Sequence, residues 1–259
     1  MLTPAQADRL EVLLVSPRNP LNIGAAARAM ANFGFRHLTI VAPFAHNWME
    51  AKSAVGAPDL LRDANVHETL AEAISHCTLV LGTGSLDRRR PVQTILGLPQ
   101  AAAQIQTALA ESSPHSAHIA LVFGSEKHGL TSDDLSWCHA LIAIETCEAQ
   151  PSMNLGQAVA VCLYEISRHP ESSQPNPPLI DSFQPKIKSP DTEQLDRLAA
   201  LVEETMEAVN YSTRGMRSAN GQALRVLLRR LMPNEPDRRR MMGLFRRILW
   251  QLGRGSGKV

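Results

Sequence analysis

The side chain with the clearest chemical potential is that of Arg28, the single charged residue in the segment 22–34. At 100° per residue, the apolar residues of this segment gather on one side of a helix, and Arg28 lies roughly 140° away from Ile23. The guanidinium is therefore expected to face solvent, a ligand or another subunit. An ordinary solvated arginine is the alternative for this segment taken by itself.

A second candidate is Glu126, which follows the buried-type apolar run 119–123 and Gly124. A glycine at this place lets a ligand approach the backbone, and the carboxylate could hold a cation or orient an arginine. A purely structural role in fixing the loop fits the same pattern equally well.

A third group of candidates lies in the segment 145–159. Ser152 is well placed to cap the helix that follows, so that the free amides of the first turn point at the loop. Asn154 is expected just inside that helix, where it is a poor helix former with both a donor and an acceptor available. Capping alone explains Ser152, whereas Asn154 points more clearly to a site.

Gly82 and Gly84 follow another strand-like run. The residues after them do not open a helix, and no Gly-x-Gly-x-x-Gly pattern follows the first apolar run, so a nicotinamide-binding fingerprint is not indicated. The two glycines still permit close approach of a ligand to the backbone, and a plain tight turn is the alternative.

The elements that must position these residues alternate between strand-like and helical patterns. The expected strands are 12–15, 37–41, 79–81, 119–123 and 141–144, and the expected helices lie near 22–34, 67–76, 99–111, 131–137 and 153–168. This alternation predicts an α/β fold with an open, mostly parallel sheet that helices cover on both faces. Such sheets build sites where a helix begins just after a strand ends, as it does beyond the turn 16–22.

The charge is divided unevenly along the chain. A Pro-rich linker, 170–190, separates the α/β domain, 1–169, from a helix-rich extension, 191–259. Residues 1–210 hold 14 Lys/Arg against 23 Asp/Glu, a balance of −9, whereas residues 211–259 hold 12 against 2, a balance of +10. Apolar residues recur at helical spacing there, which favours an ordered basic module over a solvated tail. The module is expected to bind a polyanion.

Composition limits the class of protein. A chain of 259 residues with 44% hydrophobic content can bury a substantial core, which excludes disordered and fibrous classes. Its apolar runs are too short to cross a bilayer, and its first residues lack a signal-peptide pattern. The four cysteines form no Cys-x-x-Cys pair, so neither a zinc site nor a disulfide framework is indicated. A cytoplasmic protein with reduced thiols, no metal and no membrane partner is expected.

Three patterns follow one another in the chain: Asn-x-Gly-x-x-x-Arg-Ala from Asn22, Leu-Val-Phe-Gly-x-Glu-x-x-Gly-Leu from Leu121, and Ser-x-Asn-Leu-x-x-Ala-Val from Ser152. Together they resemble the three motifs of TrmH-type methyltransferases of the SPOUT superfamily, and the resemblance covers residues 10–168. Within that family the chain looks most like the TrmJ branch, which methylates the ribose 2'-hydroxyl at position 32 of the tRNA anticodon loop. The basic helical tail is similar to the tail of that branch.

The resemblance implies a deep trefoil knot at the C-terminal end of the α/β domain, S-adenosylmethionine as methyl donor, and a homodimer whose active site combines both subunits. The residues that it places against the donor are Thr83, Gly84, Ser85, Gly124, Ile144, Pro151, Ser152 and Met153. It further implies that Arg28 is catalytic, that Asn22 and Asn154 orient Arg28 or the ribose, and that Ser152 and Glu126 act beside them.

The chemistry implied is an in-line attack of the ribose oxygen on a methyl group, which mainly requires collinear positioning. A guanidinium stays protonated in water and does not readily accept a proton. Our hypothesis is therefore that Arg28 grips the adjacent phosphate or stabilises the developing alkoxide, with the proton passing to water or to a transiently neutral Arg28.

Three other functions are compatible with the sequence to different degrees. Within the methyltransferase class, the substrate could be ribosomal RNA or another tRNA position. A noncatalytic RNA-binding protein with the same fold is the rival from another class, and it would show no affinity for S-adenosylmethionine. A nicotinamide-dependent oxidoreductase is disfavoured by the missing fingerprint and by the basic C-terminal module.

Overall fold

The structure is a computed structural model that describes residues 2–44, 48–50, 54–84, 91–110, 117–168, 189–211 and 215–255. Ser85, which is one of the predicted donor contacts, and residues 170–188 of the predicted linker lie outside the described residues.

A seven-stranded sheet forms the centre of the α/β domain. Its strands are β1 (Leu10–Val15), β2 (His37–Val41), β3 (Asn65–His67), β4 (Leu79–Thr83), β5 (Thr94–Gly97), β6 (Ile119–Phe123) and β7 (Ala140–Ala143). They lie in the order β3-β2-β1-β6-β4-β7-β5, and every pair of neighbours is parallel. The predicted open parallel sheet is confirmed.

The order of the strands shows how distant segments come together. β6 pairs between β1 and β4, and β7 pairs between β4 and β5, so two late strands insert between strands formed by earlier parts of the chain. Because all of them are parallel, the carboxyl ends of β1, β6, β4 and β7 share one edge of the sheet. This is the edge at which open α/β sheets place their ligands.

Helices cover both faces of the sheet. They are α1 (Pro4–Ala7), α2 (Pro20–Phe33), α3 (Pro58–Arg62), α4 (Leu70–Ala73), α5 (Leu98–Ala110), α6 (Ser132–Ser136) and α7 (Leu155–Ser167), with one 3₁₀ turn, η1 (Trp48–Glu50). Alternate strand residues point to opposite faces. In β1, Val12 and Leu14 belong to the core that α2, α5 and α7 cover, whereas Leu13 and Val15 belong to the core beneath α4 and α6.

The most extensive helix packing in the described part of the chain is between α2 and α7, and it depends on a glycine. A Cβ atom built on Gly156 of α7 would lie 2.6 Å from the Cβ of Ala25 in α2. Two small residues at the crossing thus let the helix backbones approach, which brings the amino-terminal ends of α2 and α7 together.

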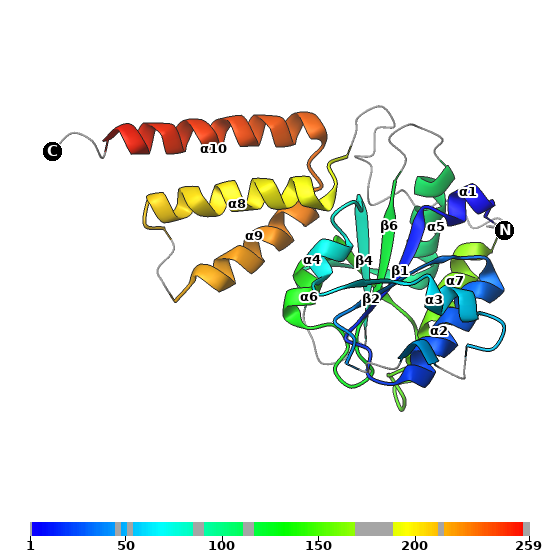
Figure 1. Ribbon diagram of the computed structural model, residues 1–259. Coiled ribbons are helices and arrows are strands. Elements are labelled where there is room, and N and C mark those ends of the chain that lie inside the picture. Colours follow the sequence, from blue (N-terminus) through cyan, green and yellow to red (C-terminus); the bar gives the residue numbers. More distant parts are fainter. Residues whose placement is uncertain are drawn as a thin grey trace.

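The C-terminal helices form a separate small unit. They are α8 (Thr192–Ala208), α9 (Arg217–Leu231) and α10 (Glu235–Gly255), and they gather on one side of the sheet, away from α2 and α7 (Figure 1). Their shared core contains Leu198, Ala199 and Leu228, with Val202, Leu224, Met241, Met242 and Phe245 packed around them. The predicted ordered helical extension is therefore confirmed. No helix in the described part of the chain is long and apolar enough to cross a membrane.

The sequence patterns missed several short elements. The helix predicted near 67–76 is only the short α4, because residues 65–67 form the edge strand β3. β5 and α3 were not predicted either. Edge strands such as β3 and β5 are half exposed, so they lack the continuous apolar run by which the buried strands are recognised.

We expect Gly156→Ala to destabilise the protein by about 1–3 kcal/mol, because the added methyl group must separate α2 from α7. The matched control is Gly243→Ala in α10, where an added Cβ meets nothing within 4 Å. That control should stabilise the protein by up to about 1 kcal/mol through helix propensity. Urea unfolding of both variants measures the difference, and equal effects would contradict the role given to Gly156.

Candidate active site

The carboxyl ends of β6, β4 and β7 lie side by side, since β4 pairs with β6 on one side and with β7 on the other. Thr83 ends β4, and its hydroxyl donates to the Val122 carbonyl of β6 at 3.2 Å. The segments that begin at Gly84, Gly124 and Ile144 therefore leave the sheet at one place. Three separate parts of the chain predicted to touch a methyl donor thus come together.

Gly124 begins a tight loop that folds back on its own backbone. A Cβ atom at Gly124 would lie 2.1 Å from the carbonyl carbon of Gly129 and from the backbone nitrogen of Leu130. The Gly129 N–H closes the loop by donating to the Ser125 carbonyl at 2.8 Å, and Gly129 has a φ of +64°. The chain itself thus requires glycine at position 124, and the loop presents Glu126 at a defined place.

Glu126 joins this loop to the start of α2. Its Oε2 accepts the backbone N–H of Arg18 at 2.9 Å, and its Oε1 accepts the backbone N–H of Asn19 at 3.0 Å. Oε1 also accepts Nδ2 of Asn22 at 2.9 Å. The expected cation or guanidinium partner is replaced by these three N–H donors, because the Arg18 side chain instead lies over the Phe44 ring, 4.1 Å from its centroid.

The same hydrogen-bond chain continues to α7 through two asparagines. Nδ2 of Asn154 donates to Oδ1 of Asn22 at 2.9 Å, and Oδ1 of Asn154 accepts the Gly156 N–H at 3.0 Å. Asn154 is therefore the N-cap of α7, which begins at Leu155. The predictions that Ser152 caps this helix and that Asn154 lies inside it are wrong, since the amide of Asn154 supplies the capping oxygen and still has a donor for Asn22.

The hydrogen bonds around Glu126 also set its charge. Burial of the carboxylate opposes ionisation, but the amide of Asn22 and the N–H groups of Glu126, Arg18 and Asn19 outweigh it and lower the pKa of Glu126 below its ordinary value. Glu126 is thus a carboxylate at neutral pH. Its oxygens are occupied by structural donors, so it acts as a bracket between loops rather than as a proton acceptor.

The segment between β7 and α7 adds an apolar wall to this edge. The Thr146 hydroxyl donates to the Pro151 carbonyl at 3.2 Å, which folds the segment back on itself. Ile144, Pro151 and Met153 are half-buried, and Ser152 is exposed. Partly covered apolar side chains beside exposed backbone can accept a flat apolar ring with a few polar groups.

Arg28 stands apart from this hydrogen-bonded group. It is exposed on α2, as predicted from its helical position, and it makes no hydrogen bond or ion pair with any residue that the structure describes. Asn22 precedes it by six residues, or about 9 Å along the helix. Within one chain, Asn22, Glu126 and Asn154 contact one another. Arg28 lies further along α2, the same helix as Asn22, and its side chain is exposed.

Asn19 belongs to the same hydrogen-bonded group, although the motifs did not identify it as a site residue. Its side-chain oxygen accepts the Leu21 N–H at 2.9 Å and caps α2, while its own N–H donates to Glu126. The signal was present in the pair Asn19-Pro20, because proline is favoured in the first position of a helix directly after an asparagine cap.

The arginines of α9 and α10 whose side chains the structure describes fall into three groups. Arg217, Arg230, Arg239, Arg240, Arg246 and Arg247 are exposed, although Arg217 pairs with Glu207 and Arg239 with Glu235. Arg238 is half-buried and pairs with Glu235 at 2.7 Å. Arg225 is half-buried and Arg229 is buried, with 1% of its side chain exposed. The exposed group is available to a polyanion, whereas Arg225 and Arg229 serve contacts inside the protein.

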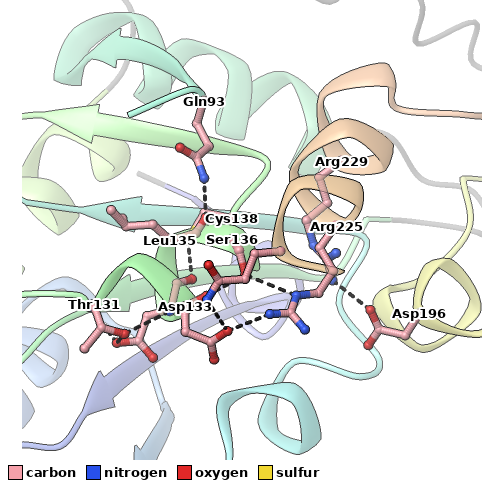
Figure 2. Close-up of polar contacts among 11 residues, drawn as sticks. Gln93, Thr131, Asp133, Leu135, Ser136, Cys138, Asp196, Arg225 and Arg229 are labelled. Atoms are coloured by element: carbon pink, nitrogen blue, oxygen red, sulfur yellow. Dashed lines mark hydrogen bonds and ion pairs between the residues drawn. The ribbon is translucent and has the colours of Figure 1, made fainter. Parts of the chain in front are cut away.

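Arg225 and Arg229 project from α9 toward α6 and α8, as Figure 2 shows. Arg225 forms an ion pair with Asp133 at 2.6 Å and donates from Nε to the Ser136 hydroxyl at 3.1 Å. Arg229 pairs with Asp196 of α8 at 3.2 Å. Both guanidinium groups also lie over the Trp137 ring, at 4.6 and 4.9 Å from its centroid.

Burial around Arg229 affects its neighbours. Desolvation and the nearby guanidinium lower the pKa of His139 to about 3, so that this histidine is neutral. Its Nδ1 accepts the Val80 N–H at 3.0 Å. Nε and Nη1 of Arg229 have no hydrogen-bond partner among the described residues. A buried cation of this kind depends on its remaining partners, Asp196 and Trp137.

A separate group of possible metal ligands lies at the amino end of the sheet. Glu11, His76 and Cys77 offer ligand atoms within 4.8 Å of one another. Glu11 already pairs with His76 at 3.3 Å and accepts the Thr39 hydroxyl. The hydrogen bond to Glu11 raises the pKa of His76, and burial raises the pKa of the Cys77 thiol. The contact between Glu11 and His76 beside a buried thiol accounts for this group.

Comparisons with known proteins agree with this architecture. The model of the SpoU rRNA Methylase family matches residues 9–164. The chain is 38% identical over 179 residues to tRNA (cytidine/uridine/adenosine-2'-O-)-methyltransferase TrmJ of Pseudomonas aeruginosa, covering 68% of this chain and 67% of that protein. It is 30% identical over 242 residues to tRNA (cytidine/uridine-2'-O-)-methyltransferase TrmJ of Salmonella choleraesuis, covering 93% and 96%.

A solved structure shows the same arrangement of the whole chain. The crystal structure of TrmJ from Z. mobilis ZM4 superposes with a TM-score of 0.76 at 27% identity, and the match covers 92% of this chain and 98% of that one. The likeness therefore extends beyond the α/β domain to the C-terminal helices. The chain belongs to the SpoU methylase family of the SPOUT superfamily, and within it to the TrmJ type.

Proposed function

We propose that this protein is an S-adenosylmethionine-dependent tRNA methyltransferase that modifies a ribose 2'-hydroxyl. The observation that carries the proposal is the hydrogen-bond chain from Glu126 through Asn22 to Asn154. It joins one residue from each of the three family motifs, at the sheet edge where Gly84, Gly124 and Ile144 also meet. A structural protein that had merely kept the fold would not need this convergence at a ligand-binding edge.

The residues at this edge fit the methyl donor. Gly84 and Gly124 expose backbone, Ile144, Pro151 and Met153 supply partly covered apolar surface, and no described side chain of the group carries a charge that would repel a sulfonium cation. S-adenosylmethionine supplies the methyl group when bound there. The trefoil knot expected from the family is part of this proposal, and the insertion of β7 between β4 and β5 supports it.

Arg28 completes the site from outside the hydrogen-bonded group. Leu21 and Arg28 are seven residues apart, so they lie on one stripe of α2. Leu21, and Val161 and Tyr164 of α7, are exposed apolar side chains on the same pair of helices. We propose that this surface forms the homodimer interface and that Arg28 reaches the site of the partner subunit.

In that position Arg28 would stabilise a negative charge on the RNA rather than remove a proton from the hydroxyl. Its guanidinium is the fixed cation that a phosphate or a developing alkoxide requires, and its planar fork can hold two oxygens at once. The bracket formed by Glu126, Asn22 and Asn154 fixes the start of α2, and therefore the helix from which Arg28 projects.

The substrate that we propose is tRNA, methylated at nucleotide 32 of the anticodon loop on cytidine or uridine. The names of the relatives support tRNA as substrate, and the exposed arginines of α9 and α10 provide a surface for its phosphates. Acting on tRNA, the enzyme would work in the cytoplasm.

Mass-spectrometric mapping of ribose methylation in tRNA and ribosomal RNA tests this function, in cells with and without the gene. We expect loss of 2'-O-methylation at nucleotide 32 of tRNA, with restoration by the purified protein and S-adenosylmethionine. Loss at a different tRNA position or in ribosomal RNA would replace the proposed target. Absence of any S-adenosylmethionine binding in calorimetry would refute a methyltransferase role.

We expect Arg28→Ala to lower kcat by about 10²–10³-fold, the usual cost of losing a donor that stabilises developing charge. The kcat of Arg28→Lys should also be well below that of the wild type, because an ammonium group lacks the planar fork of a guanidinium. Affinity for S-adenosylmethionine should be unchanged in both. Arg36→Ala, another exposed arginine next to α2, is the control and should be fully active. Near-normal turnover of Arg28→Lys would show that the fork is not required.

We expect Glu126→Gln to lower the free energy of unfolding at neutral pH by about 1 kcal/mol, since one accepting oxygen is replaced by a donor facing other N–H groups. The pKa of Glu126 is lowered on folding, so its ionised form stabilises the fold fully above the ordinary carboxyl pKa. That contribution is lost as the pH falls through the folded-state pKa. The difference between wild type and Glu126→Gln should therefore shrink in acid.

Chemical denaturation between about pH 7 and pH 3 measures this effect, because the range spans the ordinary carboxyl pKa. Glu148→Gln is the control, since Glu148 is exposed in the neighbouring loop and makes no hydrogen bond or ion pair within the described residues. If the free energy of unfolding of Glu126→Gln stays below that of wild type by the same amount over the whole pH range, the charge of Glu126 is not what holds the loops together.

A further inference from the structure

The C-terminal unit docks on the face of the sheet that lies opposite Arg28. α9 packs against α6, which covers the same core as α4, whereas α2 and α7 cover the other core. Figure 1 shows α8, α9 and α10 on one side of the sheet and α2 and α7 on the other. The basic surface and the proposed catalytic arginine of one chain therefore lie on different sides of the molecule.

Two sets of contacts hold the C-terminal unit in this place. At the start of α8, the N–H groups of Thr192 and Glu193 donate to the carbonyls of Cys77 and Ser75, at 2.9 and 3.0 Å. Along α9, Gln222 and Arg225 both donate to Asp133, and Arg225 and Arg229 lie over Trp137. We call the residues Asp133, Ser136, Trp137, Asp196, Arg225 and Arg229 the arginine clamp. Figure 2 labels all of them except Trp137.

The arginine clamp turns two cations toward carboxylates and an aromatic ring rather than toward solvent. Arg229 is buried, and two of its nitrogens lack partners among the described residues. Burying this cation costs solvation free energy, and the contacts that remain hold its side chain in one position. The clamp acts on α6, which connects the loop holding Glu126 to β7 and hence to Ile144. A tether that only kept the basic helices nearby would need none of these contacts.

We infer that Asp133, Arg225 and Arg229 are positioning residues that lock the basic helices to α6, so that RNA is gripped at a fixed distance from the methyl-transfer edge. The inference rests on the proposed function, because it assigns the grip to the tRNA substrate. When the unit is fixed, tRNA bound at the exposed arginines holds its target ribose at a high effective concentration near the methyl-transfer edge. When the unit is loosened, this effective concentration falls, but the methyl-transfer step itself is unchanged.

The decisive variant is Asp133→Lys, tested in the full-length protein. It breaks the pair with Arg225 and at the same time makes the surface more positive by two charges. Simple electrostatics would then strengthen RNA binding, whereas loss of the clamp should raise the KM for tRNA by about tenfold or more. kcat at saturating tRNA and affinity for S-adenosylmethionine should stay within about twofold of wild type.

The matched control is Glu207→Lys, which breaks an exposed pair of the C-terminal unit, Arg217 to Glu207 at 3.2 Å, with the same change in charge. Within the described residues, this pair makes no hydrogen bond or ion pair with α6. Its KM for tRNA should be unchanged or lower. The double variant Asp133→Lys with Arg225→Glu restores opposite charges across the contact and should bring the KM part of the way back toward wild type, because the contacts of Arg225 with Ser136 and Trp137 stay lost. Thermal unfolding of each variant identifies misfolding, and the double variant supplies the test if Asp133→Lys alone is unstable.

A KM for Asp133→Lys at or below the wild-type value would overturn the inference. So would a folded double variant whose KM stays as high as that of Asp133→Lys. Either result would leave the proposed function intact as long as the wild-type protein methylates tRNA. A wild-type protein without methyl transfer to tRNA would instead refute the proposed function itself.

Discussion

The carboxylate of Glu126 is the point on which the arrangement of this site depends. Its two oxygens accept N–H groups from the loop after β1 and from the first turn of α2, although Glu126 itself follows β6. Chain segments that lie far apart in the sequence are held together by one ionised group and the asparagine pair beside it. An uncharged residue could not accept three donors in this way.

That bracket works only because glycine is placed at two close approaches. Gly124 lets the Glu126 loop fold onto its own backbone, and Gly156 lets α7 approach α2 closely enough for Asn154 to reach Asn22. Larger residues would separate the partners by more than a hydrogen bond tolerates. Packing and polar contacts therefore support each other, and neither the helix pair nor the loop would define the site alone.

The basic residues of the C-terminal helices divide their work between structure and substrate. A net charge of +10 in residues 211–259 suggests one continuous surface for a polyanion. The structure withdraws Arg225 and Arg229 from that surface and uses them against Asp133, Asp196 and Trp137. Charge counted along a sequence thus overstates the positive surface, because a cation buried against a carboxylate or an aromatic ring is not available to RNA.

Periodicity and motif spacing were enough to predict the open parallel α/β sheet, the buried strands, the long helices and the outward direction of Arg28. These follow from local rules, because continuous apolar runs and a helical stripe are properties of adjacent residues. Local residue patterns indicated Glu126 and Asn154 as candidates, and the family motifs added Asn22. The half-exposed strands β3 and β5 gave no comparable signal, and Ser152 was mistaken for the cap of α7 since Ser and Asn cap helices almost equally well.

Local patterns in the sequence specify the buried strands and the long helices, and they show which residue types are available for the chemistry. The three-dimensional fold is needed to see that Glu126 bonds Asn22, that Asn154 caps α7, and that α9 docks on α6 through its arginines. Strand order, and the contacts that follow from it, arise from pairing between residues far apart in the chain, and local patterns do not report such long-range pairing. No local pattern specifies that β6 and β7 insert between strands formed earlier in the sequence.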